Sequence, residues 1–311
     1  MASRLDAKDV RIFCEMAFGT TSFSAIQDRR VSPAEIGRKV GLDEKTVRVR
    51  VKKMEEDGFI KYYQVMPNLG LLGLTLVGFY RLEALNLRTK YNVVERTHDT
   101  QYVVETVDYL GQTVTVAIAG SSPGEVQQVA DGLASEFELH KREFHQRQTV
   151  QPSLRPDNLD WQVIKELRYS ARRSSSDLAK ALTITPRMAD YRIGRLLDSG
   201  AMLVRATIDP RKQTGLVFYE LEASVEERDR GSVAAELASR FGERLWSTLP
   251  LKDGLTASLF GFSIGEAEDD AIDASSIKGV KSCFPYLLKE TIEPRGPNWI
   301  DRMIDDRLSK S

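Results

Sequence analysis

The chain contains one sequence pattern twice, and this repeat constrains its architecture more than any single residue does. Residues 32–60 (SPAEIGRKVGLDEKTVRVRVKKMEEDGFI) align without a gap with residues 174–202 (SSSDLAKALTITPRMADYRIGRLLDSGAM), at an offset of 142. Apolar positions coincide along the alignment, as where Val51 aligns with Ile193. A repeat of this length indicates that the chain is built from two copies of one structural unit.

Each copy carries the signals of two short helices joined by a tight turn. In the first copy, Ser32 suits the N-cap, Pro33 suits the first helical position, and Glu35 is placed to complete a capping box. Asp43 is the expected N-cap of the next helix, and Gly58 suits its C-terminal left-handed position. The second copy has corresponding signals at Ser174, Asp177, Thr185, Pro186 and Gly200. This arrangement predicts a helix-turn-helix, followed by a wing of two strands over residues 59–65.

A further helix precedes each helix-turn-helix. In the first copy an apolar stripe over residues 10–17 predicts it. Aligning the Leu-Asp pairs at residues 5–6 and 159–160 gives an offset of 154 before the helix-turn-helix, against 142 within it. The first copy is therefore expected to carry about 12 more residues in a loop over Thr20–Arg30.

A strand-helix-strand-strand-helix-strand order follows each winged helix. In the first copy the expected elements are residues 74–83, 88–97, 102–109, 113–119, 123–137 and 141–150. In the second copy they are residues 217–225, 232–241, 244–249, 256–263, 266–277 and 280–292. This βαββαβ order is that of the ferredoxin-like split βαβ unit. Its sheet leaves one face open for a partner sheet, so we expect the two units to pack together.

The predicted fold class is α+β, with two winged helix-turn-helix domains alternating with two ferredoxin-like domains. The expected divisions are 1–70 (winged helix 1), 71–150 (ferredoxin-like unit 1), 151–157 (linker), 158–213 (winged helix 2), 214–293 (ferredoxin-like unit 2) and 294–311 (tail). In the tail, Ile300, Ile304 and Leu308 form one apolar helical stripe, which favours docking on the chain's own body over recruitment of a partner.

Composition excludes several classes of protein. With 41% hydrophobic and 29% charged residues, the chain is typical of a soluble globular protein. Its formal net charge is −1, so any positive surface for nucleic acid must be local. No apolar run of about 18 residues and no signal-peptide pattern occurs, so we expect a cytoplasmic protein without a membrane partner. Cys14 and Cys283 are expected to be buried thiols rather than a disulfide.

The helix-turn-helix at 32–58, the Gly-Phe-Ile at 58–60 and the βαββαβ unit together resemble the Lrp/AsnC group, the feast/famine regulators of bacteria and archaea. The resemblance covers nearly the whole chain twice and is best at residues 5–84. Members carry one such unit per chain and pair through their ferredoxin-like domains. The resemblance therefore implies double-stranded DNA as a partner and a tandem fusion that pairs internally as a pseudo-dimer. A further homodimer stays open as an alternative.

The second helix of the helix-turn-helix is the expected DNA reader, because such a helix buries one face and presents polar side chains on the other. Val47, Val51 and Met54 form its inward stripe. The predicted DNA-contacting residues are Lys45, Thr46, Arg48, Val49, Lys52, Lys53 and, on the wing, Lys61 and Tyr62. Lys45 and Arg48 suit base edges, whereas Lys52, Lys53, Lys61 and Tyr62 suit phosphates. A solvated helix face with internal ion pairs is the alternative.

The second copy has a weaker reading face. Asp190 replaces Arg48 and Gly194 replaces Lys52, which adds a repulsive charge toward phosphates and a mid-helix glycine. Three side chains that suit DNA remain there: Arg187, Tyr191 and Arg195. We therefore expect the first winged helix to dominate DNA affinity, with the second weaker or purely structural.

The resemblance also implies amino-acid sensing at the hairpin between the second and third strands of the ferredoxin-like unit. The residues at these hairpins are Asp108 and Gly111 in the first unit and Asp253 and Gly254 in the second. Aspartate precedes glycine in both hairpins, whereas the family pattern places aspartate after glycine. This difference argues against amino-acid sensing and leaves a small-molecule effector at these residues as an alternative.

Other chemistry is poorly represented in the sequence. His140 and His145 are five residues apart, which predicts opposite faces of a strand and no metal site. No nucleophile motif and no cofactor is expected. Siroheme decarboxylases resemble the same layout, but their hallmark is a histidine- and arginine-bearing second ferredoxin-like strand. Neither corresponding strand here, 102–107 or 244–249, holds a histidine. Such an enzyme, or a winged-helix protein-interaction scaffold, remains as an alternative function.

Overall fold

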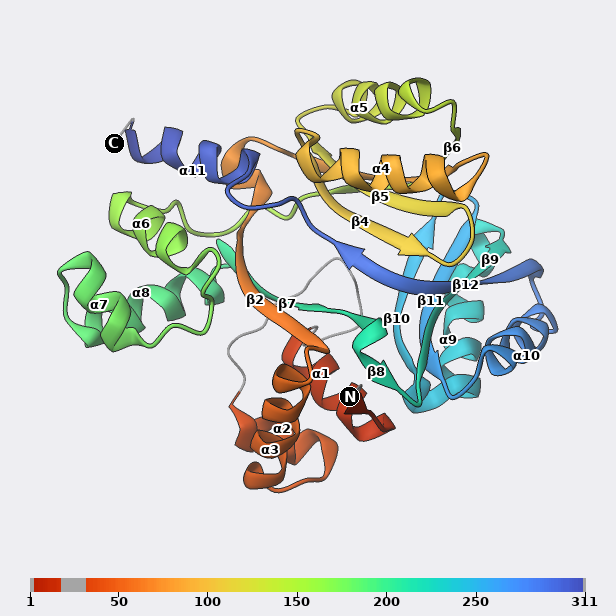
Figure 1. The fold of residues 1–311 in the computed structure, drawn as a ribbon, viewed down its shortest axis with the longest axis horizontal. Helices are drawn as coiled ribbons and strands as arrows, with labels where there is room; N and C mark the ends of the chain where they lie inside the picture. The colour runs from red at the N-terminus through yellow and green to blue at the C-terminus, as the bar shows by residue number, and fades with distance from the viewer. Residues whose placement is uncertain (1–2, 18–31, 310–311) are drawn as a thin grey trace.

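The computed structural model describes residues 3–17 and 32–309, so the predicted loop at 20–30 lies outside the described residues (Figure 1). Winged helix 1 contains a short strand, three helices and a long strand: β1 (Ser3–Arg4), α1 (Ala7–Ala17), α2 (Pro33–Val40), α3 (Glu44–Glu56) and β2 (Ile60–Pro67). Ser32 and Asp43 accept hydrogen bonds from the backbone N–H groups at the third helical position, as predicted. Gly58 has a φ of 78°, which explains its place after α3.

Ferredoxin-like unit 1 follows a single 3-10 turn, η1 (Leu69–Leu72). Its elements are β3 (Leu76–Glu83), α4 (Leu87–Asp99), β4 (Val103–Tyr109), β5 (Thr113–Gly120), α5 (Pro123–Glu136) and β6 (His140–Gln148). The predicted βαββαβ order is confirmed.

The second copy repeats this order. Winged helix 2 contains α6 (Asn158–Leu167), α7 (Ser175–Leu182), α8 (Pro186–Asp198), β7 (Met202–Ile208), η2 (Pro210–Lys212) and β8 (Gln213–Thr214). Ferredoxin-like unit 2 contains β9 (Val217–Val225), η3 (Glu227–Asp229), α9 (Arg230–Phe241), η4 (Gly242–Arg244), β10 (Leu245–Leu251), β11 (Gly254–Gly261), α10 (Ile264–Ser275) and β12 (Val280–Ile292). The tail forms α11 (Trp299–Ser309).

The two ferredoxin-like sheets are joined through one strand. The hydrogen-bonded order is β10-β11-β9-β12-β4-β5-β3-β6, and β12 pairs antiparallel with both β9 and β4. Its 13 residues let it run from one four-stranded sheet into the other. The open faces also contact each other, because Arg81 on β3 pairs with Glu220 and Glu222 on β9. The two units therefore contact each other and share a strand, which the sequence did not predict.

The wing differs from the prediction. Residues 59–65 do not form a strand pair within one copy: β2 is a single strand that pairs antiparallel with β7 of the other copy. The physical reason is that the equivalent strand of the other copy runs alongside, and pairing with it satisfies the backbone hydrogen-bonding groups of both strands. The expected wing hairpin is therefore wrong, and a two-stranded ribbon between the copies takes its place.

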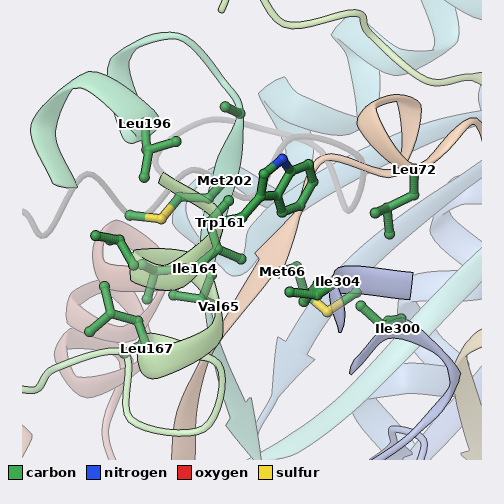
Figure 2. Packing of buried hydrophobic residues seen from close by; sticks show 14 of the residues in the cluster. Val65, Met66, Leu72, Trp161, Ile164, Leu167, Leu196, Met202, Ile300 and Ile304 are labelled. Carbon is green, nitrogen blue, oxygen red and sulfur yellow. The ribbon is translucent and has the colours of Figure 1, made fainter. Parts of the chain in front are cut away.

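The winged helices pack across the two copies. The core of winged helix 1 includes Phe218 and Phe260 from ferredoxin-like unit 2, and Phe59 stacks on Phe218 with ring centroids 5.9 Å apart. The core of winged helix 2 likewise includes Val65 and Leu72 from the first copy, as Figure 2 shows. The crossed cores mean that the halves depend on each other for burial of apolar surface.

The tail docks on the chain's own body, as predicted. Trp299, Ile300 and Ile304 of α11 are buried in the core of winged helix 2, and Leu308 packs against it. The Trp299 indole donates to the carbonyl oxygen of Val103 at 2.9 Å. No helix within 3–17 or 32–309 has both the length and the apolarity to cross a membrane.

The prediction that His140 and His145 lie on opposite faces is wrong. A register shift in β6 puts His140 opposite Glu83 and His145 opposite Phe79 on β3. Those partners are four residues apart, so both histidines lie on the same face of the sheet. Within the described part of the chain, no group of three or more His, Cys, Asp and Glu is arranged to hold a metal ion.

Candidate nucleic-acid interface

Helix α3 has the two faces that a reading helix requires. Val47, Val51 and Met54 are buried in the core of winged helix 1. The opposite face is solvent-exposed and carries five predicted contact residues: Lys45, Arg48, Val49, Lys52 and Lys53. Thr46 is half-buried, and its hydroxyl donates to Asp43 at 2.6 Å, so it serves the helix cap.

Ion pairs along α3 are local and exposed. Arg48 donates to Glu44 at 2.9 Å, and Lys52 lies 3.4 Å from Glu56. Both are pairs one helical turn apart between exposed side chains, which contribute only about 0.3–0.5 kcal/mol each. Such weak pairs can be replaced by contacts to phosphates. A solvated helix face would contain the same pairs, so they do not distinguish the two interpretations of this face.

A partly exposed clamp of ion pairs joins α3 to the start of α1. Asp6 and Asp9 form a reciprocal capping box at the start of α1, with N–H to carboxylate distances of 3.0 and 2.9 Å. Arg50, on the side of α3 nearest α1, donates to Asp6 at 3.0 Å and to Asp9 at 2.7 Å. Winged helix 2 has the same clamp at Asp157 and Asp160.

The clamp corrects the alignment of the first helices. Asp157 lies 151 residues after Asp6, whereas Arg192 lies 142 residues after Arg50, so the first copy has nine extra residues and not about 12. The repeated Asp-x-x-Asp spacing is the signal for this offset in the sequence, and the Leu-Asp pair at 159–160 gives a competing match.

The reading face of α8 is depleted of free cations. Arg195 forms an ion pair with the fully buried Asp160, which Arg192 also contacts at 2.9 Å. Arg195 therefore holds the helix in place and is a poor candidate for a phosphate contact. Arg187 and Tyr191 are exposed, and Tyr191 retains 60% of its accessible surface.

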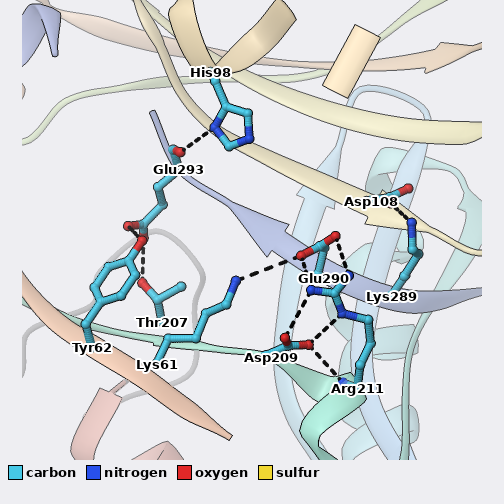
Figure 3. Close-up of polar contacts among 10 residues, drawn as sticks. All are labelled: Lys61, Tyr62, His98, Asp108, Thr207, Asp209, Arg211, Lys289, Glu290 and Glu293. Carbon is cyan, nitrogen blue, oxygen red and sulfur yellow. Dashed lines mark hydrogen bonds and ion pairs between the residues drawn. The ribbon is translucent and has the colours of Figure 1, made fainter. Parts of the chain in front are cut away.

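The two remaining candidates on the predicted wing face protein carboxylates. Lys61 lies 3.8 Å from Glu290, and the Tyr62 hydroxyl donates to Glu293 at 3.1 Å (Figure 3). Burial and the nearby Glu293 raise the pKa of the Tyr62 phenol. The β2–β7 ribbon directs these side chains toward β12, so we leave them out of the reading surface.

Glu293 is the centre of a buried polar network that the sequence analysis missed. Its carboxylate accepts from Thr207 at 3.0 Å and from Gln64, and its carbonyl oxygen lies 3.1 Å from His98 Nδ1. A cavity of about 970 Å³ opens beside it, lined in part by Tyr62 and His98. No local motif marks this network, because its members come from four separate elements.

The predicted effector residues lie in different settings. Asp108 is buried and pairs with Lys90 at 2.5 Å and with Lys289 at 2.7 Å, while the Gly111 carbonyl accepts from Lys90 at 2.7 Å. Asp253 and Gly254 form the other hairpin, where the Asp253 carbonyl accepts from Val225 at 3.2 Å. The carboxylate of Asp108 is thus already neutralised by two lysines.

Comparison with known proteins agrees with this architecture. The family described as "Winged helix-turn-helix DNA-binding" matches residues 25–61. The HTH-type transcriptional regulator LrpA of Pyrococcus horikoshii is 30% identical over 99 residues, which are 32% of this chain and 70% of LrpA.

Two solved structures share the fold over nearly the whole chain. The siroheme decarboxylase NirDL matches with a TM-score of 0.57 at 13% identity, covering 97% of this chain and 99% of NirDL. NirDL in complex with an iron-uroporphyrin III analogue matches with a TM-score of 0.55 at 12% identity, covering 97% and 98%. At these identities the similarity concerns the fold alone. The extent and identity of the match to LrpA, together with the helix-turn-helix geometry, show that the chain belongs to the Lrp/AsnC family of transcriptional regulators.

Proposed function

We propose that the chain is a sequence-specific DNA-binding regulator that reads DNA mainly through α3, and that it is not an enzyme. The observation that carries the proposal is the exposed basic face of α3, which the Arg50 clamp joins to the start of α1. Lys45 and Arg48 would contact base edges, whereas Lys52 and Lys53 would contact phosphates. The equivalent face of α8 has Asp190 and Gly194 at the positions of Arg48 and Lys52.

The test is fluorescence anisotropy of the full chain with a pool of short genomic duplexes, measured at several salt concentrations. We expect binding that weakens steeply with salt, because phosphate neutralisation releases counterions. Arg48→Ala should reduce affinity about tenfold or more, in line with about 1–3 kcal/mol for a bidentate base contact. Arg187→Ala, an arginine-to-alanine change on α8 at the position of Lys45, is the control and should change it less than threefold. Absence of binding at low salt would contradict the proposal and favour the scaffold alternative.

We further propose that the two halves form an internal pseudo-dimer. Its support is the shared strand β12 and the pairing of Arg81 with Glu220 and Glu222 across the two sheets. Light scattering at micromolar concentration decides whether a homodimer of the full chain forms as well. A monomer would leave one strong reading helix per particle and would exclude the homodimer.

A siroheme decarboxylase is the second candidate, favoured by the whole-chain fold similarity to NirDL. Against it, neither β4 (VVETVDY) nor β10 (LWSTLPL) contains a histidine, the hallmark of such enzymes on that strand. Titration of the purified chain with iron-uroporphyrin III separates the candidates. A shifted Soret band that saturates at one equivalent would support the enzyme, and we expect none.

A further inference from the structure

A second, smaller cavity of about 310 Å³ lies between ferredoxin-like unit 1 and winged helix 2. Its floor is the open face of the first sheet, and its roof comes from β2, β7 and the C-terminal end of α8. The walls are mainly apolar and include Met66, Leu69, Val77, Phe79, Val104 and Leu203.

One arginine in this cavity has no charge partner among the residues that the structure describes. Arg147 on β6 lies opposite Val77, and its Nη1 atom is buried without a hydrogen-bond partner among the described residues. Burial lowers the pKa of Arg147, and no carboxylate offsets this effect. Arg147 is half-buried, and a partly desolvated guanidinium without a charge partner among the described residues is stabilised when an anion is supplied.

The other charged side chains of the cavity are already satisfied or lie at its rim. Arg205 pairs with Glu105 and lies 3.4 Å from Glu293. Asp198, at the end of α8, is solvent-exposed. Arg147 is therefore the lining cation that has no carboxylate partner among the described residues.

We propose that this cavity binds a small carboxylate with an apolar body, whose carboxylate group pairs with the Arg147 guanidinium. A guanidinium matches the planar carboxylate with two parallel hydrogen bonds. A single unpaired cation among apolar walls suits a monoanion, whereas a phosphate would bring more charge than the cavity offsets. The volume is at the small end of the range of about 300–1,000 Å³ for ligand pockets.

The position of the cavity gives ligand binding a structural consequence. It touches β2, which follows α3 in the chain, and residues 198–200 at the end of α8. An occupant would contact both winged helices and the first sheet at once. The binding step itself does not rest on the proposed DNA-binding function.

The test is calorimetric titration of the full chain with hexanoate, phenylacetate and indole-3-acetate, each compared with its neutral amide. We expect at least one carboxylate to bind at least tenfold more tightly than its amide. Arg147→Gln should remove this preference, and Leu203→Trp should block binding by filling the cavity. Arg96→Gln, a charge loss on the exposed face of α4, is the control and should leave binding unchanged.

A second measurement separates ligand binding from a structural role. If Arg147 has no partner in the unliganded protein, Arg147→Met should leave Tm unchanged or raise it. A fall in Tm of several degrees would show that the guanidinium stabilises the empty protein, and would overturn the proposal. Equal binding of carboxylates and amides throughout the series, or no binding by any of them, would overturn it as well.

Discussion

The two winged helices differ in the residues that face solvent and agree in the residues that hold the fold. Both contain an Asp-x-x-Asp capping box whose carboxylates accept hydrogen bonds from an arginine of the third helix, Arg50 in one and Arg192 in the other. Their exposed faces have diverged: α3 presents Arg48 and Lys52, and α8 has Asp190 and Gly194 at those positions. The clamp residues that hold the fold are thus present in both copies, whereas the basic exposed face is present on α3 and reduced on α8.

The largest effect should come from giving α3 the residues of α8. In the double variant Arg48→Asp/Lys52→Gly, we expect DNA affinity to fall about 100-fold, since one base contact and one phosphate contact are lost and a repulsive charge is added. The slope of log affinity against log salt should fall by about 2. Lys52→Ala in place of Lys52→Gly controls for helix weakening, which circular dichroism would report. An unchanged affinity would break the proposed asymmetry.

The clamps of the two winged helices should differ in how much the loss of one arginine destabilises the protein. Arg50 is the one arginine paired with Asp9 in the described structure, whereas Asp160 is paired with both Arg192 and Arg195. Arg50→Ala should therefore lower the free energy of unfolding by about 2 kcal/mol, because it leaves a nearly buried carboxylate without a charged donor. Arg192→Ala should lower it by about half as much.

Urea unfolding followed by circular dichroism measures this difference. The exposed Arg48→Ala serves as the control and should change stability by less than about 0.5 kcal/mol. Equal losses for Arg50→Ala and Arg192→Ala would mean that Arg195 does not compensate for Arg192.

The reverse exchange should have a smaller effect on DNA binding. In Asp190→Arg/Gly194→Lys, we expect affinity to rise threefold to tenfold, about 0.7–1.4 kcal/mol, because only phosphate contacts are restored while Arg195 stays bound to Asp160. Anisotropy at two salt concentrations measures the gain. If affinity does not rise, α8 lies away from DNA in the complex and its role is structural.

The smallest effect concerns acid stability. Burial raises the pKa of Asp6 and Asp157, but hydrogen bonds from their capping partners and arginines outweigh it and leave both pKa values below 3.8. A folded-state pKa below the unfolded value means that the stabilisation is complete above about pH 4 and is lost as pH falls through the folded pKa. Both carboxylates are about half exposed, so solvent screening reduces this contribution and we expect it to be smaller than the effects above.

Unfolding curves between pH 2.5 and 6 test this expectation. Asp6→Asn and Asp157→Asn should each flatten the decline below pH 4, since each carboxylate accepts from its capping partner and from an arginine. A decline that persists unchanged in both variants would assign acid sensitivity to other carboxylates.

The amino-acid sequence by itself determined the local elements. Caps such as Ser32 and Asp43, the glycine at 58, and the apolar stripes act over a few residues, so the helices and the βαββαβ order were readable from spacing alone. The exposed face of α3 followed from the same periodicity.

Only the tertiary structure decided which elements from the two copies pair. The β2–β7 ribbon, the shared strand β12 and the crossed cores join residues more than a hundred positions apart, and backbone pairing of this kind leaves no local signature. The same reason explains the network around Glu293 and the unpaired Arg147: a charged residue in the sequence does not show whether a partner from another element will meet it. Which side chains and strands pair depends on long-range packing. The repeat indicates that two similar units are present but does not specify how they pack.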